Sequence, residues 1–184
     1  MGSVSVTWAK AIACVAIGLV LIAANREPPV LLIRPLPTAL DIDGVGDLKV
    51  GMTLEQVKAM TSAKIAIHNN EDPQGECVFA EFPDFRDHFT FMLIKGTIAR
   101  FDVYEGKVKT AEGAGIGSTE EEVKRIYARA KIEVTPHAYV DGHYLEVTMP
   151  GFTNLRYVFE TNGKTVTAFR AGRLPEVGYV EGCA

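Results

Sequence analysis

A short internal repeat constrains the fold of this chain more than any other feature. Residues 50–57 read VGMTLEQV, and residues 116–123 read IGSTEEEV. In each copy a glycine supplies a turn, a threonine can cap a helix, and acidic residues follow in the first turn, where they favour the helix dipole. The repeat therefore predicts two helices, over about residues 54–63 and 120–130, each of which starts a structural unit.

Each expected helix is followed by a loop and then by three segments with strand character. The two loops are assigned to residues 68–76 and 133–142. Phe89, Phe91 and Leu93 alternate with His88, Thr90 and Met92, which is the period of a strand. The six expected strands cover residues 77–82, 88–94 and 97–104 in the first copy, and 143–149, 154–160 and 164–170 in the second.

A hairpin is expected at the end of the second copy. Asn162 and Gly163 form one of the strongest short-range hairpin signals. Across this turn we expect one face of residues 154–160 to meet one face of residues 164–170. The residues expected on that shared face are Leu155, Tyr157 and Phe159 on one strand and Val166, Ala168 and Arg170 on the other.

These patterns predict an α+β fold. Two tandem units, each a helix plus a three-stranded antiparallel sheet, pack as one domain behind an N-terminal signal or anchor helix. The expected boundaries are a signal peptide or membrane anchor over residues 1–24, an extended arm containing prolines over 25–43, the first unit over 44–112, and the second unit with a C-terminal tail over 113–184.

The N-terminus has the pattern of a secretory leader. A single positive charge at Lys10 precedes 14 apolar residues, 11–24, and a polar break with Pro28 and Pro29 follows. As a helix, such a stretch rises about 21 Å, which is short of the roughly 30 Å hydrocarbon core of a bilayer. The pattern predicts a periplasmic or secreted protein of bacterial type. Membrane attachment through an uncleaved segment 1–24 is the alternative.

Two cysteines remain beyond the leader. Cys77 and Cys183 are an even count in a chain that we expect to reach an oxidising compartment. Pairing them would close a loop of about 106 residues and would restrict the unfolded chain by roughly 4–5 kcal/mol. It would also hold the last segment of the chain on the body of the protein. Two separate thiols are the alternative.

Charge and motifs exclude several functions. The formal net charge is −4, which does not favour nucleic acid as a partner, because phosphate binding requires a positive face. The stretch Gly113–Gly117 is rich in glycine but lacks the lysine of a phosphate-binding loop. No Gly-x-Ser-x-Gly nucleophile motif occurs either. We therefore expect a protein that is not an enzyme and has no cofactor.

Two polar segments are candidates for a binding site. His137, Asp141 and His143 could form part of a metal site, although their spacing also suits a polar loop. In the same segment, Tyr139 and Tyr144 could present aromatic surfaces to a sugar.

The second segment is the C-terminal run. Arg170, Arg173, Glu176 and Tyr179 would form a rigid recognition surface if Cys183 is bonded to Cys77. The alternative is that this run only covers an edge of the sheet, as natural proteins commonly require.

A family resemblance can be stated at this point. The Gly-Met-Thr-x-x-x-Val helix start at 51–57, followed by three strands and repeated once, resembles the tandem modules of secreted beta-lactamase inhibitor proteins. It also resembles the small lipoprotein of the outer-membrane barrel-assembly machinery. The resemblance covers most of residues 44–172 and implies helices on one sheet face and a concave opposite face open to a partner. The second copy departs from the pattern, because Ser118 stands where the first copy has Met52. No inhibitor loop matches in this chain, so the resemblance does not imply inhibition of beta-lactamase.

The sequence thus leads to one main expectation of function and two alternatives. We expect an exported, non-enzymatic binding module of the cell envelope that contacts a protein or a cell-wall component through its sheet face. A carbohydrate-binding protein is the first alternative, and a metal-dependent enzyme that uses His137, Asp141 and His143 is the second. A membrane would be a partner only through residues 1–24.

Overall fold

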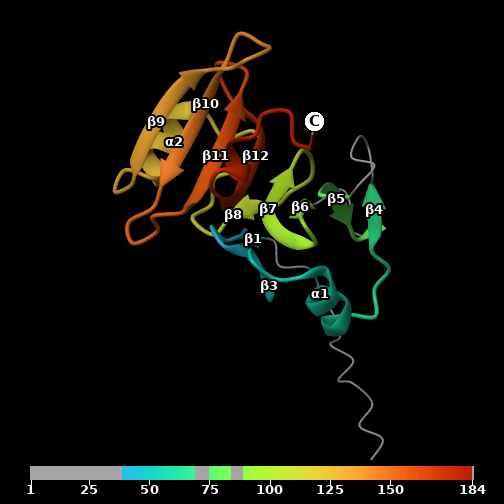
Figure 1. Ribbon diagram of the computed structural model, residues 1–184. Helices are drawn as coiled ribbons and strands as arrows, with labels where there is room; N and C mark the ends of the chain where they lie inside the picture. The colour runs from blue at the N-terminus through green and yellow to red at the C-terminus, as the bar shows by residue number, and fades with distance from the viewer. Residues whose placement is uncertain (1–38, 69–74, 84–88, 184) are drawn as a thin grey trace, which may run out of the picture.

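An eight-stranded antiparallel sheet forms the centre of the structure, a computed structural model (Figure 1) that describes residues 39–68, 75–83 and 89–183. The strand order is β4-β5-β6-β7-β12-β11-β10-β9. The strands span β4 (Ala66–His68), β5 (Cys77–Glu81), β6 (Thr90–Ile94), β7 (Thr97–Val103), β9 (Lys131–Pro136), β10 (His143–Thr148), β11 (Leu155–Thr161) and β12 (Val166–Arg173). The fold is therefore a mixed α+β fold.

The expected leader 1–24 and most of the expected arm 25–43 lie outside the described residues, as does His88. In the part of the chain that the structure describes, no helix is both long enough and apolar enough to cross a membrane.

The two expected helices are present, and both begin at the predicted threonine. In α1 (Leu54–Met60) the Thr53 hydroxyl accepts a hydrogen bond from the Gln56 amide, and the Gln56 side chain accepts one from the Thr53 amide. In α2 (Glu120–Ile126), Thr119 and Glu122 make the same reciprocal pair. This arrangement satisfies amide groups that a helix start otherwise leaves free.

Both helices are shorter than the sequence predicted. The first was expected to reach residue 63, but it ends at Met60 because Thr61 adopts extended backbone angles. The second was expected to reach residue 130, but turns follow Ile126.

Equivalent backbone contacts attach each helix start to the sheet. The Gly51 amide donates to the Ile98 carbonyl at 2.8 Å, and the Ile98 amide donates to the Met52 carbonyl at 2.8 Å. In the other half of the sheet the Gly117 amide donates to Val166 at 2.9 Å, and the Val166 amide donates to Ser118 at 2.8 Å. The two helix starts are therefore held against β7 and β12 in the same way.

One apolar core lies between the helices and the sheet. Val57 of α1 and Val123 of α2 are both fully buried in it, together with Phe101 of β7 and Phe159 of β11. The chain enters this core at Leu40, which belongs to the short strand β1 (Ala39–Leu40). Strand β1 pairs in parallel with β8 (Lys109–Thr110), and a small hairpin of β2 (Gly44–Val45) and β3 (Leu48–Lys49) follows it.

Two outer strands were not predicted. The sequence indicated three strands after each helix and a loop over 133–142, whereas β9 covers residues 131–136 and pairs with β10 at six positions. Strand β9 is mostly exposed and carries Lys131 and Glu133, so its hydrophobic pattern is weak. At the opposite edge, β4 is a strand of only three residues, and it includes His68, which was assigned to the other loop.

The hairpin of β11 and β12 also differs from the expectation. The pairing shifts between Glu160 and Thr161, so that Phe169 lies opposite Phe159 and Ala171 lies opposite Tyr157. An irregularity of this kind turns the following residues to the other side of the sheet. Phe169 and Ala171 therefore enter the core with Tyr157 and Phe159. Arg170, which was expected to share a face with Tyr157 and Phe159, lies on the opposite face.

The pairing of β7 with β12 joins the two halves of the sheet. Arg170 lies opposite Asp102, and Gly172 lies opposite Arg100. Gly172 has no room for a side chain, because a Cβ atom there would lie 2.4 Å from the Arg100 Cβ and 2.5 Å from the Ala99 carbonyl oxygen. The close approach of these two strands requires glycine at this position.

Replacing Gly172 with alanine should therefore destabilise the protein by about 2–3 kcal/mol, because the added methyl group forces the strands apart. Chemical unfolding of the oxidised protein would measure the change. Gly178→Ala is a matched control, since nothing lies within 4 Å of the added methyl group and its φ is not in the left-handed region. Equal stability of the two variants would contradict this account.

Candidate binding surface

The C-terminal segment (Leu174–Cys183) lies across the sheet face opposite the helices, here called the outer face. A disulfide joins Cys183 to Cys77 of β5, with 5.4 Å between their Cα atoms, which confirms the predicted pairing. Between Leu174 and Cys183 the segment forms a short 3-10 helix over Glu176–Gly178. The tail of the chain is thus attached to the half of the sheet that is distant in sequence.

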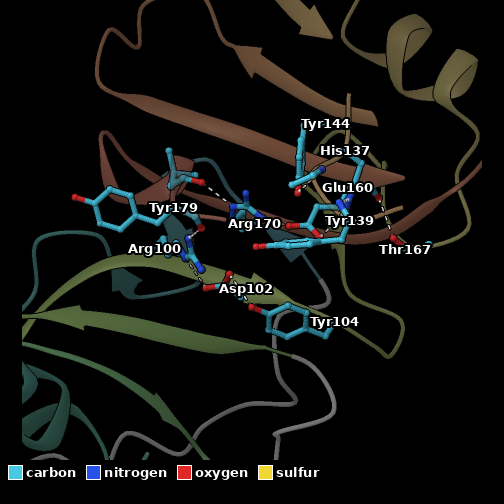
Figure 2. Close-up of polar contacts among 12 residues, drawn as sticks. Arg100, Asp102, Tyr104, His137, Tyr139, Tyr144, Glu160, Thr167, Arg170 and Tyr179 are labelled. Atoms are coloured by element: carbon cyan, nitrogen blue, oxygen red, sulfur yellow. Dashed lines mark hydrogen bonds and ion pairs between the residues drawn. The ribbon is translucent and has the colours of Figure 1, made fainter. Parts of the chain in front are cut away.

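Beneath this segment lies a row of four charged side chains, here called the charged strip: Arg100, Asp102, Glu160 and Arg170. Figure 2 shows these four side chains and marks the contacts among them with dashed lines. The Arg100 Nε is 3.0 Å from Asp102 Oδ2, and Arg170 Nη1 pairs with Glu160 Oε1. All four belong to β7, β11 and β12, so the sheet itself brings opposite charges together.

Both arginines also bind the main chain of the C-terminal segment. Arg100 Nη1 donates to the Glu176 carbonyl at 2.9 Å and to the Tyr179 carbonyl at 2.7 Å. Arg170 Nε donates to the Val177 carbonyl at 2.6 Å. Hydrogen bonds from charged donors are stronger than neutral ones, and these three hold the segment through its backbone.

An apolar contact adds to this attachment. Val177 is fully buried and packs against Tyr144 of β10 and Val158 of β11, with Leu174 beside them. This small cluster is separate from the main core, because it lies on the outer face of the sheet.

Burial shifts the pKa of one carboxyl group in the strip, Asp102, and of Tyr104 beside it. Desolvation raises the pKa of the Asp102 carboxyl, and the neighbouring guanidinium groups of Arg100 and Arg170 oppose that rise. Desolvation, followed by the charge of Asp102, also raises the pKa of Tyr104. The Tyr104 hydroxyl therefore stays protonated and donates to Asp102 Oδ1 at 3.2 Å.

The structure separates the predicted binding residues into two groups. Arg170 is 4% exposed, Glu176 is 8% exposed and Tyr144 is also buried, so these three are covered while the C-terminal segment is in place. Arg173 is partly exposed and pairs with Glu176 at 3.0 Å. By contrast, Tyr139 is 64% exposed and Tyr179 is 42% exposed.

The two exposed tyrosines lie at one hollow of about 460 Å³, which is open to solvent and surrounds the disulfide. The Tyr139 hydroxyl donates to the Glu181 carboxylate, and this hydrogen bond raises the pKa of Tyr139. The contact links the β9–β10 loop to the end of the chain. The residues that line the hollow are Cys77, Ile94, Ala138, Tyr139, Tyr179, Val180, Glu181, Gly182 and Cys183.

The proposed metal ligands are not brought together. His137 stacks on the Tyr144 ring at 4.4 Å and lies 3.6 Å from Glu160, on the outer face. His143 Nδ1 instead lies 2.8 Å from Oε1 of Glu120 in α2, and Asp141 is exposed. Across residues 39–68, 75–83 and 89–183, no group of three or more His, Cys, Asp and Glu side chains is placed to hold a metal ion.

Glu120 forms a polar contact between α2 and the sheet. Partial burial opposes its ionisation, but hydrogen bonds from Thr161 at 2.6 Å and from His143, with the charges of His143 and Lys124, lower its pKa below the ordinary value of 4.5. A carboxyl group with a lowered pKa contributes stability above its unfolded pKa and loses that contribution as the pH falls through its folded pKa.

Glu120→Gln should therefore lower the free energy of unfolding by about 1–2 kcal/mol at about pH 7. The difference from the parent should shrink as the pH falls through the lowered pKa of the Glu120 carboxyl in the folded protein. Urea unfolding across this pH range would measure it. Glu121→Gln is the matched control, because the Glu121 side chain is 82% exposed. A difference that persists unchanged at the acid end would contradict the role of the ionised carboxylate.

The comparisons with known proteins give a structural likeness and no family. No family model and no curated protein matches this chain. A crystal structure of the uncharacterized protein yfeY from Escherichia coli is similar, with a TM-score of 0.50 and 18% identity over 73% of this chain and 99% of that chain. At this level of identity the likeness shows the fold alone.

Sequence reasoning did not identify Arg100 and Asp102 as important residues. A signal was present, because the two opposite charges stand two residues apart in an apolar strand and must share one face of it. Their burial depends on the C-terminal segment, whose position the sequence does not reveal.

Arg170→Gln should destabilise the protein by about 3 kcal/mol, because it removes the cation beside Glu160 and the donor to the Val177 carbonyl in a buried place. Lys95→Gln is the control, since Lys95 pairs with Glu76 at 3.8 Å and both side chains are mostly exposed. Thermal and urea unfolding would compare the two. Similar losses would show that the strip contributes no more than a surface ion pair.

Proposed function

We propose that this protein is an exported, non-enzymatic binding module of the cell envelope, and that its partner contacts the hollow around the disulfide. The observation that carries the proposal is the placement of Tyr139 and Tyr179. They come from two distant segments, both are exposed, and both line the same hollow. Export is supported by the leader pattern of residues 1–24 and by the disulfide, since disulfides persist in oxidising compartments.

The rigidity of the hollow supports a binding role. Tyrosine is enriched at binding interfaces because it offers a large contact area at a low cost in conformational entropy. Here Tyr179 belongs to a segment fixed by its own carbonyl bond to Arg100, by buried Val177 and by the disulfide, and Tyr139 is held by Glu181. A partner would therefore meet a surface that is already ordered.

The same proposal includes the origin of the fold. We infer that the two halves of the sheet are tandem copies of one module, each a capped helix followed by an antiparallel sheet. The repeated sequence at 50–57 and 116–123 and the matching backbone contacts of Gly51 and Gly117 support this inference.

A sugar is the second candidate for the partner, and the carboxylate of Glu181 favours it. A hollow with two tyrosine rings and a charged acceptor offers both the apolar surface and the hydrogen bonds that a sugar ring uses. A protein partner would use the same rings as anchors.

Photocrosslinking in cells tests the proposal. A photoreactive phenylalanine analogue would replace Tyr139 or Tyr179, with Phe152 and Ile67 as control positions, because both are exposed but do not line the hollow. We expect one adduct shared by positions 139 and 179, absent from both controls and lost in a Cys77→Ser/Cys183→Ser protein. Adducts of equal yield at all four positions, or none from the hollow, would refute it.

A titration with soluble cell-wall glycan fragments separates the two partner classes. If the partner is a glycan, the oxidised protein binds the fragments, and Tyr179→Ala weakens binding while Phe152→Ala does not. Calorimetry would give both affinities. A protein adduct in cells without any fragment binding would identify a protein partner.

A further inference from the structure

The surface beneath the C-terminal segment differs from an ordinary protein core. The charged strip pairs within itself, Arg100 with Asp102 and Arg170 with Glu160, and these contacts do not involve the segment. Arg100 also lies over the Phe79 ring at 5.7 Å, and Arg170 lies over the Tyr144 ring at 6.0 Å. Because ionised groups are well solvated, this surface can face water if the segment leaves.

The contacts that the segment makes with the strip are contacts that other polypeptides could make. Arg100 and Arg170 bind three carbonyl groups of the main chain, and such groups are present in every peptide. The side chain of the segment that is buried against the sheet is a branched aliphatic one, Val177, which packs between Tyr144 and Val158 with Leu174 beside it. Recognition is therefore mostly independent of sequence.

We propose that the charged strip, with Tyr144 and Val158, is a binding site for a short polypeptide segment that carries a branched aliphatic residue, and that the C-terminal segment, with its 3-10 turn over Glu176–Gly178, occupies this site while the disulfide is intact. The site is distinct from the hollow around Tyr139 and Tyr179, and it does not depend on the function proposed for that hollow. Opening it dismantles the hollow, because Tyr179, Val180 and Glu181 leave with the segment.

The disulfide controls access to the site. Cys77 and Cys183 line the open hollow, so a dithiol reductant of the thioredoxin class can reach them. A thiolate of the reductant attacks one sulfur of the Cys77–Cys183 bond and forms a mixed disulfide with it, which releases the other cysteine. The second thiol of the reductant then attacks the mixed disulfide and releases the remaining cysteine. Cys77 and Cys183 gain two electrons and two protons and become thiols, and the reductant becomes a disulfide. The segment is then covalently attached to the fold only at Leu174, and its other attachments are the hydrogen bonds to Arg100 and Arg170, the packing of Val177 and the contact of Glu181 with Tyr139.

A peptide titration tests the site. The probe is a fluorescent peptide of residues 173–183 with serine at the position of Cys183, and the protein is the full chain with Cys77→Ser, Cys183→Ser and Val177→Asp, in which the internal segment cannot dock. By fluorescence anisotropy we expect this protein to bind the probe about tenfold or more tighter than the oxidised parent does, because the parent's own segment competes. The control probe carries aspartate in place of Val177 and should not bind.

Hydrogen exchange gives a second measurement should the triple variant fail to fold. In the Cys77→Ser/Cys183→Ser protein, the amides of Gly178 and Tyr179 should exchange about tenfold or more faster than in the oxidised parent, while the amides of β7 and β12 stay protected. A folded triple variant that binds no probe would overturn the proposal. Unchanged protection of Gly178, or loss of protection in β12 together with it, would also overturn it. None of these outcomes alters crosslinking from Tyr139 in the oxidised protein, so the two proposals fail separately.

Discussion

Antiparallel pairing of β7 with β12 brings the two halves of the molecule into one sheet, and it also brings their charges together. Because Arg170 lies opposite Asp102 and Gly172 lies opposite Arg100, the outer face at this junction is polar while the other face carries Phe101 and Phe169 into the core. A polar junction cannot be covered by an ordinary apolar layer. The cover must supply hydrogen-bond acceptors, and the carbonyls of residues 176, 177 and 179 supply them.

The C-terminal segment therefore belongs to the fold and to the candidate surface at once. Its backbone satisfies two buried arginines, its Val177 fills a small apolar site, and its last residues form one wall of the hollow beside Tyr139. The same buried charges that attach the segment make its removal physically feasible, because each arginine keeps a carboxylate partner within the sheet. A segment attached through its carbonyl groups and a disulfide can therefore leave the sheet more readily than a segment whose side chains are part of the apolar core.

Local signals in the sequence predicted most of the elements and fewer of the contacts. Thr53 and Thr119 cap their helices through residues only three positions away, and the hairpin at Asn162 depends on neighbours, so both were predictable. The register shift at Glu160 reversed the face expected for Arg170, and no local pattern marks it.

Arg170 and Glu176 were expected at the surface. They are buried because their surroundings come from segments far away in the chain, which one sequence does not reveal. The pairing of Cys77 with Cys183 was predictable because only two cysteines remain beyond the leader.

The position of β1 determines on which side of the sheet the described chain begins. Leu40 is buried in the core on the helix side of the sheet, where the Tyr157 hydroxyl donates to its carbonyl at 3.2 Å, and β1 pairs there with β8. The chain thus enters the fold on one side of the sheet and ends on the other (Figure 1). A domain fused directly at residue 39 would therefore be joined on the side of the sheet remote from Tyr139 and Tyr179. Such a fusion point leaves the outer face on the other side of the sheet from the fused domain.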